Sequence, residues 1–187
     1  MTGQRARAPR VDGVLNRERL VSCARRIFAE QGPDAPLEAV AQAASVSRTT
    51  LYRHFRTREE LAAAVLEENV ASIEARAAEL RGHTRGIVDL FDFVLDQQRD
   101  NGALVQVLAR SDLTPLIPLS HRTVAAFQPL LEEGLRQGVV HPDVQIRDVM
   151  IAFPMAAEAI VDAARTGDVM DQRVRAMLHR ALWIADS

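Results

Sequence analysis

Several residue types are scarce in this sequence of 187 residues. It has a single cysteine, Cys23, and so cannot form an internal disulfide or a CxxC metal site. We interpret Cys23 as a small buried thiol, with a redox sensor as the alternative. No apolar run approaches the about 18 residues that a membrane helix needs. No apolar run follows the arginines of the first ten residues either, so we expect no secretory signal and a place in the reducing cytoplasm.

Aromatic residues are also few, at 4% of the chain, whereas alanine is abundant. Alanine is the best helix former, and strands favour β-branched and aromatic residues. No segment alternates apolar and polar residues as a half-buried strand would. The pattern therefore predicts an all-α fold of about nine helices, over residues 16–31, 36–44, 48–55, 58–80, 84–99, 103–109, 115–137, 145–165 and 169–185.

Lysine is absent, and the arginines are unevenly placed. Residues 1–58 hold 11 arginines and 5 acidic residues, whereas residues 59–187 hold 12 arginines and 20 acidic residues. This asymmetry indicates that the N-terminal part binds a polyanion. We expect residues 1–15 to form a flexible basic arm along DNA, with a merely disordered terminus as the alternative.

The N-terminal part has the spacing of a helix-turn-helix. The predicted helices 36–44 and 48–55 are short, and three residues from Ser45 to Ser47 join them. Ser47 is well placed to cap the second of these helices. Leu51 and Phe55 are four apart and should point inward together. Arginine can read guanine edges, and hydroxyl groups can contact phosphates. The residues expected to contact DNA are Ser47, Arg48, Thr49, Tyr52, Arg53, His54 and Arg58.

This region closely resembles the DNA-binding domain of the TetR family of repressors. The matching residues are Val40-Ala41, Ala44, Val46-Ser47, Leu51-Tyr52, His54-Phe55 and Glu60-Leu61. The specific match covers residues 16–62, about a quarter of the chain. Two features depart from the family pattern. Ser45 stands where the family usually has glycine, and Ala35-Pro36 stands where it usually has a threonine N-cap.

The resemblance implies a C-terminal domain, residues 63–187, that binds an inducer and dimerises through its last two long helices. For each interface or effector residue that follows, ordinary packing in the core is the alternative. The interface would use the residues Ala152, Ala156, Ala159, Ala163, Val174, Leu178 and Leu182. The effector would contact Phe91, Leu95, Gln98, Leu104, Leu108, Arg110, Leu116, Phe127, Met150 and Phe153.

The primary hypothesis is a homodimeric repressor, released from near-palindromic double-stranded operator DNA by a small, mostly apolar effector. The alternative is a helical ligand-binding or adaptor protein without specific DNA binding. We expect no enzyme activity and no cofactor. The five histidines lack metal-ligand spacing, and no nucleophile-elbow, phosphate-loop or dinucleotide motif occurs.

Overall fold

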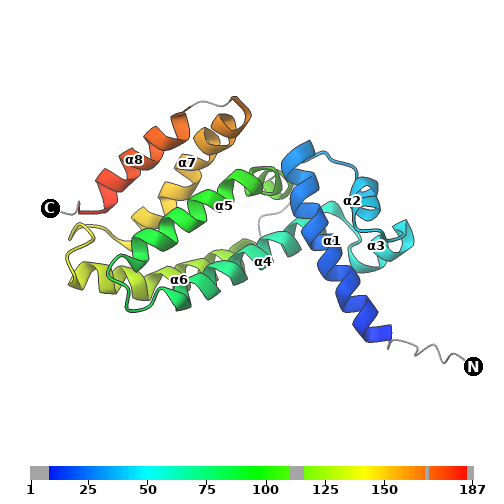
Figure 1. Cartoon of the computed structure of the whole chain (residues 1–187), viewed down its shortest axis with the longest axis horizontal. Helices are drawn as coiled ribbons and strands as arrows, with labels where there is room; N and C mark the ends of the chain where they lie inside the picture. Colours follow the sequence, from blue (N-terminus) through cyan, green and yellow to red (C-terminus); the bar gives the residue numbers. More distant parts are fainter. Residues whose placement is uncertain (1–8, 110–115, 167–168, 185–187) are drawn as a thin grey trace, which may run out of the picture. The chain divides into compact units, whose positions relative to one another are not determined.

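A computed structural model describes residues 9–109, 116–166 and 169–184, and over these ranges the chain is helical (Figure 1). The helices are α1 (Pro9–Gln31), α2 (Leu37–Ala43), α3 (Arg48–His54), α4 (Arg58–Glu79), α5 (Gly86–Ala109), α6 (Leu116–Arg136), α7 (Ile146–Thr166) and α8 (Met170–Leu182). The all-α prediction is confirmed. None of the helices in the described ranges is long and apolar enough to cross a membrane.

The predicted helix boundaries were wrong at α1 and at α5. The segments 84–99 and 103–109 are one helix, α5, which passes through Asn101 and Gly102 without a break. A single helical glycine costs only about 1 kcal/mol relative to alanine, so it does not by itself end a helix. Residues 9–15 belong to α1, although we expected them in a flexible arm. Proline is well tolerated in the first turn, which lets the helix begin at Pro9.

The chain divides into two compact units. The first comprises the described parts of Met1–Val65 and Ala103–Ser111, and the second comprises those of Leu66–Gly102 and Asp112–Ser187. The end of α5 thus belongs with the N-terminal helices. The division expected from the sequence, after residue 62, had instead placed the whole of α5 in the C-terminal domain.

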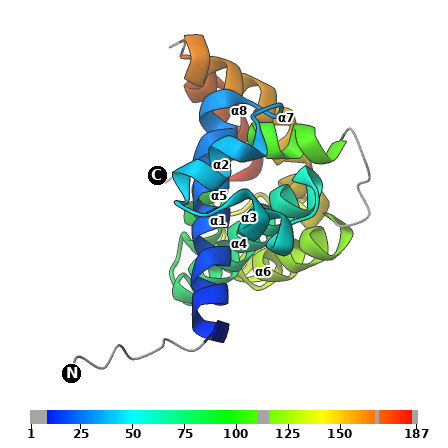
Figure 2. The same ribbon diagram turned by 90° about the vertical axis from the view of Figure 1, so that its right-hand side faces the viewer.

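In the first unit, α2 and α3 lie side by side next to α1 (Figure 2). The core between them is mainly aliphatic and fully shielded from solvent at Leu20, Val40 and Leu51. Phe28 and Phe55 are buried as well. An arginine covers each of these rings: the guanidinium carbon of Arg58 lies 5.8 Å from the centre of Phe28, and that of Arg17 lies 5.3 Å from the centre of Phe55.

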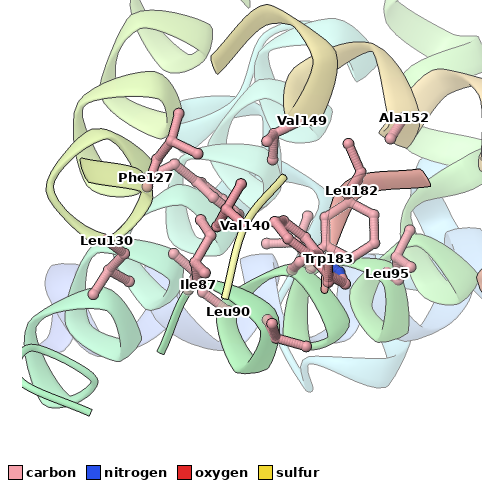
Figure 3. Close-up of a cluster of buried hydrophobic side chains, with 14 of the residues drawn as sticks. Ile87, Leu90, Leu95, Phe127, Leu130, Val140, Val149, Ala152, Leu182 and Trp183 are labelled. Carbon is pink, nitrogen blue, oxygen red and sulfur yellow. The ribbon is translucent and has the colours of Figure 1, made fainter. Parts of the chain in front are cut away.

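The core of the second unit is aromatic at its centre (Figure 3). The ring of Phe91 lies 5.1 Å from that of Phe153 and 5.4 Å from that of Trp183, centre to centre. Phe127 packs edge-on against Phe153 at 5.7 Å. Rings from α5, α6, α7 and the end of α8 therefore meet in one cluster.

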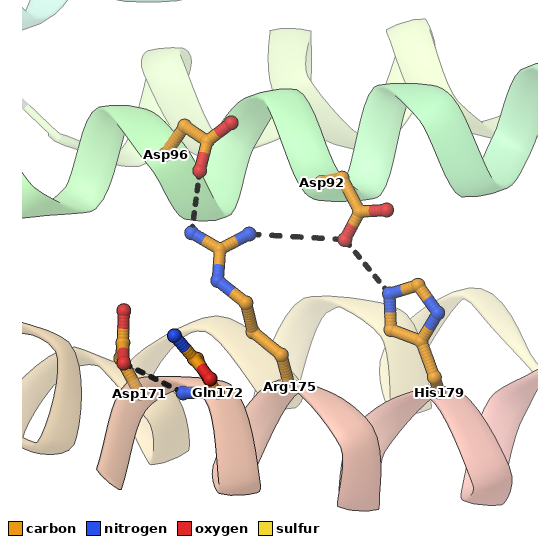
Figure 4. A network of polar contacts seen from close by, with 6 residues as sticks. All are labelled: Asp92, Asp96, Asp171, Gln172, Arg175 and His179. Carbon is orange, nitrogen blue, oxygen red and sulfur yellow. Dashed lines mark hydrogen bonds and ion pairs between the residues drawn. The ribbon is translucent and has the colours of Figure 1, made fainter. Parts of the chain in front are cut away.

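Polar contacts join the helices of the second unit at its surface. On α8, Arg175 contacts Asp96 of α5 at 2.6 Å and Asp92 at 3.8 Å, and His179 Nε2 lies 2.7 Å from Asp92 (Figure 4). The Arg122 guanidinium of α6 donates two hydrogen bonds to the Glu74 carboxylate of α4. These bonds lower the pKa of Glu74.

The end of α8 is fixed by a short antiparallel bridge that the sequence did not predict. Val140 pairs with Trp183, while the amide of Ile184 donates to Val139 and the amide of His141 donates to Leu182. The predicted helix 169–185 ends early because Trp183 has extended backbone dihedrals and joins this bridge.

Candidate nucleic-acid interface

The turn between α2 and α3 is a helix end with a defined hydrogen-bond pattern. The amide of Val46 donates to the Ala41 carbonyl, and the amide of Ser45 donates to the Gln42 carbonyl. This pair of bonds defines a Schellman motif, whose key residue is left-handed. Ser45 holds that position at a φ of 55°. The sequence had indicated this strained residue, because glycine is usual there in the family.

The start of α3 is fixed by Ser47. Its hydroxyl accepts a hydrogen bond from the Thr50 amide at 3.1 Å and also lies 2.9 Å from the Thr50 hydroxyl. Ser47 is thus the N-cap of α3, as predicted. Leu51 is buried at 1% exposure, so the opposite side of α3 faces outward.

Most of the residues predicted to contact DNA lie on this outward side. Ser47, Arg48, Thr49, Tyr52 and Arg53 are all exposed. Together they form a surface of two guanidinium groups, three hydroxyl groups and a threonine methyl. Such groups can read base edges and bind phosphates. Their exposure is consistent with the predicted DNA contacts, which stay a prediction.

His54 is less available than the sequence suggested. It is half-buried, and its Nε2 is shielded from solvent with no hydrogen-bond partner among the described residues. Burial, followed by the charges of Arg53 and Arg17, lowers the pKa of His54 below 6.5. The imidazole is therefore mainly neutral at pH 7, which disfavours a charged contact to a phosphate.

Arg58 also has a role that the sequence did not reveal. Its Nη1 donates to the carbonyl oxygens of Pro33 at 2.7 Å and Ala35 at 2.5 Å, and its guanidinium covers Phe28. The side chain is half-buried. Arg58 therefore holds the loop before α2, where Pro36 provides no side-chain cap. A phosphate contact by its remaining donors is still a prediction.

The start of α4, next to Arg58, carries a capping box in a modified form. The Glu60 amide donates to the Thr57 hydroxyl at 3.1 Å. The Glu60 carboxylate accepts from the amide of Arg56 at 2.7 Å. Reciprocal bonds of this kind fix the chain direction from α3 into α4.

The predicted effector residues fall into three groups. Phe91, Leu95, Phe127 and Phe153 are buried in the core of the second unit, and Leu104 is buried in the first. Half-buried positions are Gln98, Leu116 and Met150. Leu108 lies on α5, but its side chain is outside the described part of the structure, as is the whole of Arg110.

The predicted dimer residues lie on α7 and α8, and several of them are buried within their own unit. Ala152, Ala156 and Leu182 are buried in the core of their own unit. Ala159, Val174 and Leu178 are half-buried, and the side chain of Ala163 is outside the described set. The sequence pattern could not separate an interface from a core, because both faces of α7 carry apolar residues. The structure instead exposes Ile151 and Met155.

The three-helix arrangement with a capped and exposed α3 is that of a helix-turn-helix protein. Residues 20–65 match the family model described as bacterial regulatory proteins, tetR family, which confirms the resemblance seen in the sequence. Residues 20–65 are therefore similar to the N-terminal region of the TetR family. No curated protein sequence matches the chain.

Solved structures support the same fold over nearly the whole chain. A TetR transcription regulatory protein from Mycobacterium vanbaalenii is 23% identical, with a TM-score of 0.71 over 94% of this chain and 99% of the other. A TetR transcriptional regulator from Streptomyces coelicolor is 22% identical, with a TM-score of 0.67 over 91% and 99%. A third structure, described as the molecular basis for control of antibiotic production by bacterial hormones, is 21% identical with a TM-score of 0.69 over 95% and 100%.

Proposed function

We propose that this protein is a homodimeric transcriptional repressor that binds a near-palindromic operator and leaves it when a small, mostly apolar effector binds. The observation that carries the proposal is the outward face of α3. Arg48, Thr49, Tyr52 and Arg53 are exposed on a helix that Ser47 caps and Leu51 anchors. A rigid helix with such a face suits the major groove.

The outer face of α7 and α8 is the proposed dimer interface. Large apolar side chains are exposed there: Ile151 at 59%, Met155 at 67%, Met170 at 46% and Met177 at 62%. Ile151 and Met155 are four residues apart and so share one face of α7, and contiguous exposed apolar surface commonly marks an interaction site. A second copy of the same two helices would cover them in a four-helix bundle.

The second unit is the proposed effector-binding region. Its interior is apolar and aromatic, and one predicted contact residue, Gln98, has a side-chain oxygen that is shielded from solvent and unpaired within the described ranges. Such an acceptor is suited to a hydroxyl or amine donor on an otherwise apolar molecule. The solved structure that concerns control of antibiotic production by bacterial hormones has a similar fold, which supports a signalling molecule as the effector.

The central test is selection of bound duplexes from a random-sequence DNA library. We expect the full-length protein to select a sequence with two-fold symmetry and half-sites about 34–36 Å apart. Arg53→Ala should relax the preference at one position in each half-site, by about 5- to 150-fold in discrimination. Tyr52→Phe should weaken binding to all sequences alike.

Arg81→Ala is the matched control, because Arg81 is exposed but lies outside the first unit. It should leave the selected sequence unchanged. Selection of no sequence would favour the alternative, a ligand-binding or adaptor protein without specific DNA binding.

A further inference from the structure

The two arginines on the outward face of α3 have different surroundings. Arg48 Nη2 lies 2.5 Å from the Glu38 carboxylate of α2. No carboxylate contacts the Arg53 side chain within the described part of the chain. One guanidinium therefore contacts a carboxylate before any DNA arrives, whereas the other has no such contact among the described residues.

The backbone around this ion pair is fixed on both sides. Glu38 lies in the first turn of α2, between the buried residues Leu37 and Val40. Arg48 directly follows the N-cap Ser47, and the Schellman turn at Ser45 joins the two helices. The separation of the two backbone positions is thus set by the helix-turn-helix.

The pair itself adds little to folding stability. The side chains are 69% exposed at Arg48 and 44% exposed at Glu38, and exposed pairs of this kind contribute little because water and salt screen them. A carboxylate on this face also disfavours phosphate. Its presence beside a guanidinium expected to meet DNA therefore points to a function in recognition.

Arginine reads guanine by presenting two N–H groups to O6 and N7. The guanidinium has five N–H donors in a planar fork, so one can be held by a carboxylate while others remain available. Fixing the fork in advance removes rotamer freedom that would otherwise be lost on binding. A carboxylate beside Arg48 would also lower its attraction to any phosphate.

We propose that Glu38 is a specificity-determining positioning residue, which holds Arg48 in the orientation that reads a guanine in each half-site. The inference rests on the proposed function, in which α3 enters the major groove. It assigns to α2, a helix with no predicted base contact, an effect on which base is selected.

The test is a double-mutant cycle with Glu38→Gln, Arg48→Ala and the combined variant. The probes are the duplex selected by the wild-type protein and duplexes in which each guanine is replaced in turn. We expect Arg48→Ala to remove the preference at one guanine per half-site. Glu38→Gln should reduce the same preference by up to about fivefold, which is the most that an exposed ion pair of this kind can contribute. In the Arg48→Ala background it should have no further effect on that preference.

Glu18→Gln is the control for charge, because Glu18 is exposed on α1 and the substitution removes the same negative charge from the same unit. It should change the salt dependence of binding but leave the base preference intact. Helix content and thermal unfolding of each variant verify that the domain is folded.

Two results would overturn the inference. If Glu38→Gln strengthens binding to all duplexes equally, and does so with or without Arg48, then Glu38 acts only through its charge. If the wild-type protein prefers a sequence but shows no guanine that depends on Arg48, the positioning role is wrong while the proposed function stands. Selection of no sequence by the wild-type protein would reject both.

Discussion

The two units of this chain are held together in different ways. In the first, the two buried phenylalanines, Phe28 and Phe55, are each covered by an arginine, and loop carbonyls are tied by the same Arg58. In the second, Phe91 is surrounded by other rings. The first unit therefore adds arginine contacts at its margin to an aliphatic core, whereas the core of the second unit is built around packed rings.

The largest effect should come from the centre of the second unit. Phe91→Ala removes the ring that contacts Phe153 and Trp183 and should lower the free energy of unfolding by about 3–5 kcal/mol. Urea unfolding can be followed by the fluorescence of Trp183, the only tryptophan. Phe93→Ala is the control, since Phe93 lies on the same helix but is only half-buried. If both variants lowered the free energy of unfolding equally, the aromatic cluster would not contribute more to stability than other packing on α5.

The margin of the first unit should give the next largest effect. Arg58→Met keeps an unbranched apolar stem but removes the donors to the Pro33 and Ala35 carbonyls, and charged hydrogen bonds of this kind contribute about 1.5–3 kcal/mol. We expect faster amide exchange in α2 and a lower melting temperature. Arg56→Met, at an exposed arginine two residues earlier, should change neither.

Arg58→Lys separates positioning from phosphate binding. Lysine keeps the charge but not the planar fork that spans two carbonyls. If Arg58 mainly positions the loop, this variant should lose stability while its salt dependence of DNA binding stays close to that of the wild type. Full stability with weaker DNA binding would instead make Arg58 a phosphate contact.

The first unit shows how far local sequence patterns reach. The apolar spacing and the serine N-cap predicted α3 correctly, because caps and periodicity act within a few residues. The carbonyl partners of Arg58 lie more than 20 residues away in the chain, so no local pattern could reveal them. The shielding of His54 Nε2 likewise depends on residues brought together by the fold.

In the second unit, the sequence could not predict which face of each helix would be buried. Ala152 and Met155 are both apolar and three residues apart on α7, yet the first is 2% exposed and the second 67%. Hydrophobic spacing alone cannot separate them when a helix has apolar residues on both sides. The bridge between Val140 and Trp183 was missed for a related reason, since a single pair leaves no alternating pattern.

The two units share one local motif, which permits a direct comparison. After α6, the amide of Val139 donates to the Gly134 carbonyl and the amide of Gly138 donates to the Leu135 carbonyl. This is the pattern found after α2, but the left-handed residue is glycine at a φ of 70° rather than serine at 55°. The first unit therefore carries a strain that the second avoids.

Substituting glycine for Ser45 and serine for Gly138 gives the smallest predicted effect, and it compares the same position of the same motif in the two units. A non-glycine residue in the left-handed region costs about 1–2 kcal/mol. Glycine recovers that cost but adds about 0.4–1 kcal/mol of freedom to the unfolded chain. Ser45→Gly should therefore stabilise the first unit by about 0.5–1 kcal/mol, and Gly138→Ser should destabilise the second by a similar amount. Thermal unfolding and amide exchange measure both.

Gln42→Gly is the control, since it places glycine in the regular helix of α2 and should cost about 1 kcal/mol. If Ser45→Gly behaved like Gln42→Gly, Ser45 would not hold a left-handed conformation in solution, and the α2–α3 turn would differ from its counterpart after α6.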